Sequence, residues 1–226
     1  MVKTTTIQRV FVWQLPVRFY HWINFVCVAI LCVTGWMIGR PYSPIWGLEA
    51  SFSYWFGTVR FLHFLAAFVF FFNFVFRIYW GFVGNEYADW RNFIPHRRKQ
   101  LREVIEVLKV DILQAKAEPM ESIGHNALAG WTYFLSFLAF VFQCATGFGM
   151  YAAMSDAALP RLFAWIVPIM GGDFAVRQWH HFMMWFFVIF SMVHVYLVFY
   201  HDYVEGRGVA SSMIGGWKFI EKHPEK

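Results

Sequence analysis

Residues 178–200 read QWHHFMMWFFVIFSMVHVYLVFY, and this stretch decides the fold. It contains no Asp, Glu, Lys or Arg, and about 20 apolar residues suffice for a helix to cross the hydrocarbon core of a bilayer. A helix satisfies its own backbone hydrogen bonds in lipid, which an isolated strand cannot do. The stretch also carries His180, His181 and His194, and ionisable groups inside membrane spans are costly and rarely idle. It therefore predicts a transmembrane helix whose histidines need a functional explanation.

Three further apolar segments precede this one, at about residues 19–38, 59–80 and 127–151. Hydrophobic residues make up 59% of the chain and charged residues only 15%, whereas a soluble domain is about one quarter charged. We therefore expect an all-α integral membrane four-helix bundle that forms a single domain over residues 1–226. Glycines such as Gly35 and Gly147 permit close helix approach or leave room for a flat cofactor.

The basic residues of the loops predict the orientation. Lys and Arg concentrate in the N-terminal tail, in the loop between the second and third segments, and in the C-terminal tail. Because the basic side is normally cytoplasmic, both termini should lie inside. The net charge of +5 then reflects membrane topology and does not indicate nucleic-acid binding. The first 18 residues are interpreted as a cytosolic tail, because they hold no long apolar core or small-residue cleavage site.

The loop between the second and third segments has a pattern of its own. Residues 98–115 place apolar side chains at a helical period with charges between them. This predicts an amphipathic helix, which lies either on the inner membrane surface or in solvent as a connector.

The histidine spacing is the main functional signal. His180 and His194 are 14 residues apart, a step that returns to within about 40° of the same helix face and rises about 21 Å. With both termini inside, His63 should share the outer level with His180, and His21 the inner level with His194. Histidine is a common axial ligand of haem iron, and the four positions predict two non-covalent, bis-histidine haem b groups. His181 lies 13 residues from His194, about 140° away, and fits less well.

Covalent attachment of haem is excluded, because none of the three cysteines forms a C-x-x-C-H motif. Cys27, Cys32 and Cys144 lie inside apolar runs, where a small buried hydrophobe is the preferred interpretation.

Four other residues are candidates at the inner end. Arg18 and Arg77 are either haem-propionate partners or ordinary interface anchors. His125 opens the third segment next to Asn126, and it serves either in capping the helix or in hydrogen bonding and proton donation to a quinone.

The motifs resemble those of a known family, the b-type cytochrome subunits of membrane-bound nickel–iron hydrogenases. Arg18-Phe19-Tyr20-His21-Trp22-Ile23, with the following run to Thr34-Gly35, is similar to that family's first signature. The stretch Trp179-His180-His181 with Trp185, Phe190 and His194 resembles the second signature, with departures at Gln178 and Phe182. Neither departure changes a residue that is expected to bind haem iron.

The resemblance implies a role that spacing alone does not. Such subunits anchor a hydrogenase, formed by a large nickel–iron and a small iron–sulfur subunit, to the cytoplasmic membrane. They pass electrons from the small subunit through the haems to quinone, so the chain itself would not act on hydrogen. The alternatives are the membrane cytochrome b of a formate dehydrogenase-type complex, and a haem-free membrane anchor or transporter whose histidines relay protons.

Overall fold

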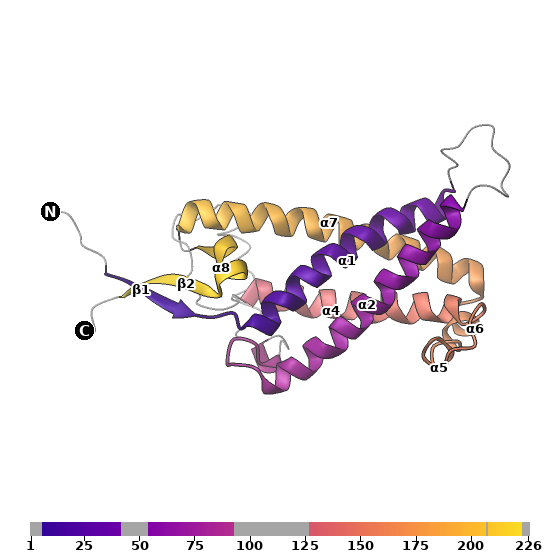
Figure 1. Ribbon diagram of the computed structural model, residues 1–226, viewed down its shortest axis with the longest axis horizontal. Coiled ribbons are helices and arrows are strands. Elements are labelled where there is room, and N and C mark those ends of the chain that lie inside the picture. The colour runs from indigo at the N-terminus through magenta and orange to yellow at the C-terminus, as the bar shows by residue number, and fades with distance from the viewer. Residues whose placement is uncertain (1–5, 42–53, 93–126, 207, 223–226) are drawn as a thin grey trace. The chain divides into compact units, whose positions relative to one another are not determined.

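The computed structural model describes residues 6–41, 54–92, 127–206 and 208–222 (Figure 1). Its four long helices are α1 (Leu15–Gly39), α2 (Trp55–Val83), α4 (Ala127–Tyr151) and α7 (Asp173–Glu205). Each contains a window that is long and apolar enough to cross a membrane. The prediction of an all-α chain with four long apolar helices is confirmed. The amphipathic helix expected at 98–115 lies outside the described residues.

Three of the four helices extend beyond the predicted spans. α1 begins at Leu15, which puts Pro16 in the first turn, where its missing N–H costs no hydrogen bond. α7 begins at Asp173, whose carboxylate pairs with Nε of Arg177 one turn later at 2.6 Å. Hydropathy delimits the part of a helix that lies in lipid, and polar turns of this kind continue the helix past that limit.

The described chain divides into two compact units, and every long helix contributes to both. We call them the central unit, with residues in Ile23–Val75 and Phe137–Met192, and the terminal unit, with residues in Met1–Trp22, Phe76–Ser136 and Val193–Lys226. The expected single domain stays a prediction.

An aromatic core holds the central unit together. One buried cluster takes residues from all four long helices: Cys27, Phe70, Phe74, Ala139, Phe140 and Phe187. Phe74 of α2 stacks on Phe140 of α4 with ring centroids 3.8 Å apart, and Phe70 meets the same ring edge-on at 4.4 Å. Lipid tails are as apolar as these side chains, so close packing rather than water exclusion favours the association. The short helices α5 (Ala158–Arg161) and α6 (Ile166–Ile169) connect α4 to α7.

The terminal unit contains a small sheet that the sequence analysis does not predict. β1 (Thr6–Phe11) pairs antiparallel with β2 (Trp217–Lys222), so Phe11 lies opposite Trp217. The helix α8 (Val209–Gly215) precedes β2 (Figure 1). Ser212 on α8 accepts a hydrogen bond from the indole N–H of Trp13 at 3.2 Å. A short 3-10 helix, η2 (Trp90–Asn92), follows α2. Because the two terminal segments pair, they lie on the same side of a membrane, as an even number of spans requires.

The turn between α8 and β2 depends on Gly216, which generates a stability prediction. Gly216 has φ +85°, and a Cβ there would lie 2.7 Å from the Phe11 ring and from the Trp13 carbonyl oxygen. Gly216→Ala should therefore destabilise the sheet by about 1–3 kcal/mol. Limited proteolysis in detergent should cleave the C-terminal segment faster in this variant.

Gly215→Ala is the matched control, because a Cβ at Gly215 meets nothing within 4 Å. Equal cleavage rates for the two variants would contradict the role given to Gly216.

Candidate functional site

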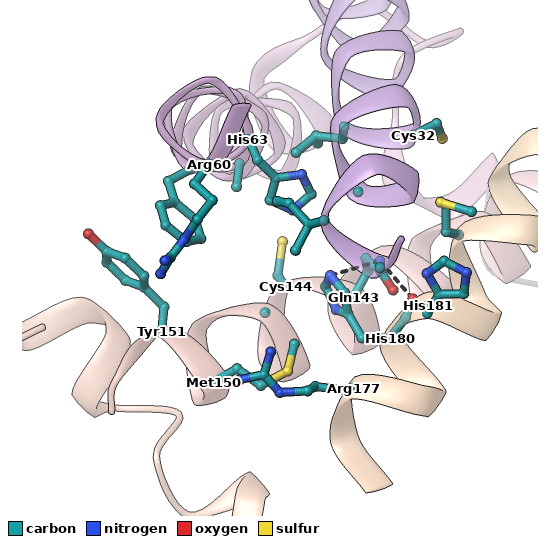
Figure 2. Close-up of a pocket in the computed structure, with 18 of the residues that line it drawn as sticks. Cys32, Arg60, His63, Gln143, Cys144, Met150, Tyr151, Arg177, His180 and His181 are labelled. Atoms are coloured by element: carbon teal, nitrogen blue, oxygen red, sulfur yellow. Dashed lines mark hydrogen bonds between the residues drawn. The ribbon is translucent and has the colours of Figure 1, made fainter. Parts of the chain in front are cut away.

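The central unit encloses a cavity of about 1160 Å³. This volume exceeds the range of about 300–1,000 Å³ usual for small-molecule sites. His63 of α2 and His180 of α7 both line it, and so does His181 (Figure 2). Most of the other lining side chains are aliphatic, aromatic or sulfur-containing. The structure therefore brings His63 and His180, which are 117 positions apart in sequence, to one apolar cavity.

α1 holds the ring of His63. Its Nδ1 lies 2.9 Å from the Thr34 hydroxyl oxygen. The next residue on α1 is Gly35, and a Cβ there would lie 3.3 Å from Cε1 of His63. A larger residue at Gly35 would press on the ring, so the glycine is what lets the imidazole lie against this helix.

α4 holds the ring of His180 in the same way. Nδ1 of His180 lies 2.9 Å from the Thr146 hydroxyl oxygen, and a Cβ on Gly147 would lie 3.1 Å from Cε1. Gln143 adds two contacts, because its amide nitrogen lies 3.2 Å from Nε2 of His180 and 3.2 Å from the His180 backbone carbonyl (Figure 2). A Thr-Gly dipeptide on a neighbouring helix thus holds each of the two histidines.

His181 has different surroundings. Its ring packs against Gly39, where a Cβ would meet Cε1 and Nδ1 of the ring at 2.9 Å. His181 lines the same cavity, and the sequence analysis ranks it behind His180 as a ligand.

Three arginines also line this cavity, and two of them each precede a histidine by one helical turn. Arg60 is three residues before His63, and Arg177 is three residues before His180 (Figure 2). Arg60 contacts the Met154 sulfur at 3.0 Å, and Arg177 pairs with Asp173. The cavity lining therefore combines the imidazoles of three histidines, mostly apolar walls and three arginines.

The terminal unit brings the other two predicted histidines together. The ring centroids of His21 on α1 and His194 on α7 are 6.2 Å apart, with His21 half-buried and His194 exposed. Metal–imidazole bonds are about 2.0 Å long, so two rings this close together could both bind one metal after small movements. Trp22 packs edge-on against His21 and donates its indole N–H to the Met213 carbonyl at 3.0 Å.

The two predicted propionate partners, Arg18 and Arg77, both make protein contacts. Arg18 donates to the Ile214 carbonyl in α8, and Arg77, which is buried, donates to the Ala88 carbonyl at 3.2 Å. The Arg77 guanidinium also lies 5.5 Å from the centre of the Tyr133 ring. These contacts fix the positions of both side chains in the terminal unit. The predicted quinone residues His125 and Asn126 lie outside the described residues.

The sequence analysis missed three side chains that line the cavity, Gln143, Arg60 and Arg177, and two that contact its histidines, Thr34 and Thr146. A signal for some of them exists in the sequence. The pattern R-x-x-H occurs as Arg18/His21, Arg60/His63 and Arg177/His180, and residues three apart share a helix face. The Thr-Gly pairs become evident only when the helices are packed.

The residues of the cavity fit a haem b. The group needs a flat apolar slot, two imidazole nitrogens and cations for its two carboxylates. The cavity contains the histidines, the aromatic and aliphatic walls and the arginines. Two glycines, Gly35 and Gly147, lie where a side chain would push on the rings.

Comparison with known proteins identifies the family of this chain. The family model described as prokaryotic cytochrome b561 matches residues 12–216. A "Probable Ni/Fe-hydrogenase B-type cytochrome subunit" from Azotobacter vinelandii is 38% identical over 216 residues, covering 94% of this chain and 89% of that protein. The protein of the same description from Cupriavidus necator is 37% identical, covering 94% and 88%. A "Probable Ni/Fe-hydrogenase 1 B-type cytochrome subunit" from Escherichia coli K12 is 34% identical, covering 96% and 93%.

The glycine contacts generate a prediction about haem binding. Gly147→Val should displace the His180 ring, because even a Cβ at this position lies 3.1 Å from it. The purified variant should retain about one haem fewer per chain than the wild-type protein, as measured by a pyridine haemochrome assay. Gly57→Val is the control, since a Cβ on Gly57 meets nothing within 4 Å. Full haem content in Gly147→Val would show that the His180 ring does not need this space.

Proposed function

The chain belongs to the prokaryotic cytochrome b561 family, and we propose that it is the membrane anchor and electron-transfer subunit of a respiratory uptake hydrogenase. It is a multi-pass protein of the bacterial cytoplasmic membrane, with four apolar helices. The partners would be the small iron–sulfur and large nickel–iron subunits of the hydrogenase, because the relatives are named as cytochrome subunits of Ni/Fe-hydrogenases. The observation that carries the proposal is the pairing of four membrane histidines in two places, each suited to one haem b.

Two histidine pairs would ligate the iron. His63 and His180 would hold one haem in the cavity of the central unit, and His21 and His194 would hold the other. A bound haem b would supply reversible one-electron chemistry at iron, which the amino acids of this chain lack. The chain itself orients the imidazoles, excludes water with aromatic walls and neutralises the propionates.

The arginines of the cavity would bind the propionates of its haem. Arg60 and Arg177 are each one turn from a ligand histidine, and guanidinium groups pair well with carboxylates. Arg18 and Arg77 would do the same for the other haem. Arg60→Leu and Arg177→Leu should each shift the midpoint potential of one haem, whereas the exposed Arg161→Leu should not. A potential unchanged in a redox titration would remove that arginine from the site.

The direction of electron flow follows from the proposed orientation. With both termini in the cytoplasm, α2 and α7 would each begin on the periplasmic side, so His63 and His180 would lie towards that side, where the hydrogenase would dock. Electrons would pass to the haem of His21 and His194 and then to quinone near the inner surface. His125 and Asn126 remain the proposed quinone residues.

Hydrogen-driven reduction tests the function. The chain purified with its hydrogenase partners should show reduction of both b-type haems under hydrogen, followed by reoxidation when quinone is added. His180→Ala should lose the haem of the cavity and block quinone reduction while hydrogen oxidation with a soluble dye persists.

The outcomes separate the competing functions. Co-purification with a molybdenum enzyme and reduction by formate would favour the formate dehydrogenase-type complex. A folded chain with no absorption in the visible region would favour the haem-free membrane anchor or transporter.

A further inference from the structure

We propose that Thr34 and Thr146 are positioning residues that fix the tautomers of His63 and His180, so that each ring presents an unprotonated Nε2 to haem iron. The proposal rests on the proposed function, because it concerns the way in which the two histidines bind haem.

The first step concerns the hydroxyl hydrogens of the two threonines. The Thr34 hydroxyl lies 2.6 Å from the Ile30 carbonyl oxygen, and the Thr146 hydroxyl lies 2.8 Å from the Phe142 carbonyl oxygen. A carbonyl oxygen only accepts hydrogen bonds, and a hydroxyl has a single hydrogen to donate. Each threonine hydroxyl therefore donates its one hydrogen bond within its own helix, to the carbonyl oxygen four residues earlier.

The second step follows for the ring nitrogens. Each hydroxyl oxygen that has donated its hydrogen keeps lone pairs, and Nδ1 of a histidine lies 2.9 Å from each. The ring nitrogen must then be the donor, so Nδ1 carries the proton. In a neutral imidazole the other nitrogen, Nε2, is left with its lone pair.

Gln143 provides an independent assignment for His180. One end of its amide lies 3.2 Å from the His180 backbone carbonyl and 3.2 Å from Nε2 of the same residue. Because the carbonyl can only accept, that end is the NH₂ group. In this structure Nε2 of His180 therefore accepts a hydrogen bond, which gives the same tautomer as the contact with Thr146. A bound haem iron would replace the Gln143 amide at this lone pair, because Nε2 has only one.

The arrangement occurs twice with the same parts. On α1 and on α4, a threonine binds Nδ1 and the following glycine makes room for Cε1 of the same ring. Two unrelated helices thus present one geometry to two histidines. In the terminal unit, by contrast, Nδ1 of His21 is buried without a hydrogen-bond partner among the described residues.

This hydrogen bond affects the metal as well as the ring orientation. A hydrogen-bond acceptor for the N–H of the ring nitrogen that does not bind the metal fixes the tautomer of a ligating histidine. It also makes the histidine a more basic ligand, which favours ferric iron. Removing the hydroxyl should therefore raise the midpoint potential and weaken haem retention.

The test compares isosteric variants of the full chain with its haem. Thr34→Val and Thr146→Val keep the shape and remove the acceptor, while Thr34→Ser and Thr146→Ser restore it. Each valine variant should bind haem at one site about 10- to 100-fold more weakly. The ferric–ferrous equilibrium of that haem should shift towards ferrous iron by up to about tenfold, equal to about 59 mV for one electron. The measurements are haem content, a redox titration and the low-temperature EPR spectrum of the ferric form.

Thr58→Val is the matched control. Thr58 makes the same bond to its own helix, at 3.1 Å from the Tyr54 carbonyl oxygen, and lies near the start of α2. It should leave both potentials and the EPR spectrum unchanged. If Thr58→Val shifts the midpoint potentials as much as Thr34→Val and Thr146→Val do, then Thr34 and Thr146 act only by stabilising their helices. That result would overturn the proposal.

Two further results would also overturn it. One is a wild-type potential and spectrum in both Thr34→Val and Thr146→Val. The other is a failure of serine to restore what valine removes. If a valine variant does not accumulate, the tautomer can be determined from redox-induced infrared difference spectra of the wild-type chain with isotope-labelled histidine. Ligation of the iron through Nδ1 would contradict the proposal. Absence of haem in the wild-type chain would instead reject the proposed function.

Discussion

A polar ring inside a membrane must find partners within the protein, and the architecture of the central unit depends on this constraint. An imidazole that leaves water without compensating bonds costs several kcal/mol, because hydrocarbon offers no hydrogen bonds. His63 and His180 meet this cost through the hydroxyls of Thr34 and Thr146. Those bonds require α1 to lie against α2, and α4 against α7. The histidines therefore specify which helix faces meet, in addition to any role with iron.

Packing makes these contacts rigid. The stacked rings of Phe74 and Phe140 join α2 to α4, and Phe187 brings α7 into the same cluster. The glycines next to the threonines let the rings approach their partner helices closely. Since a cofactor ligand must be held within a fraction of an ångström, this close packing is what turns four apolar helices into a binding site. The same apolar walls would keep water away from a haem and so influence its potential.

The sequence predicted the parts of the fold that follow from local physics. Four apolar runs of about 20 residues give four helices in lipid, and a 14-residue interval gives two histidines on one face of α7. The helix ends were less predictable, because Asp173 and Arg177 continue α7 beyond its apolar part. The β1–β2 sheet could not be predicted, since its strands are about 200 residues apart and the pairing of two such distant segments has no local signal in the sequence. Thr34 and Thr146 were equally hidden, because a threonine in an apolar helix is ordinary until its partner is known. The arginines one turn before His63 and His180 were visible in the sequence as a repeated spacing. Only the structure shows that these arginines line the same cavity as the histidines.

The central claim is that pairs of histidines, and no other side chains, ligate two haems. Met184 lies close to Gly35 and lines the same cavity, so histidine–methionine ligation is the alternative that geometry offers. The most direct test is near-infrared magnetic circular dichroism of the oxidised, purified chain, together with a count of haem per chain. The account predicts two low-spin haems per chain, both with the charge-transfer band of bis-histidine ligation. A histidine–methionine band, or a folded chain without haem, would contradict it.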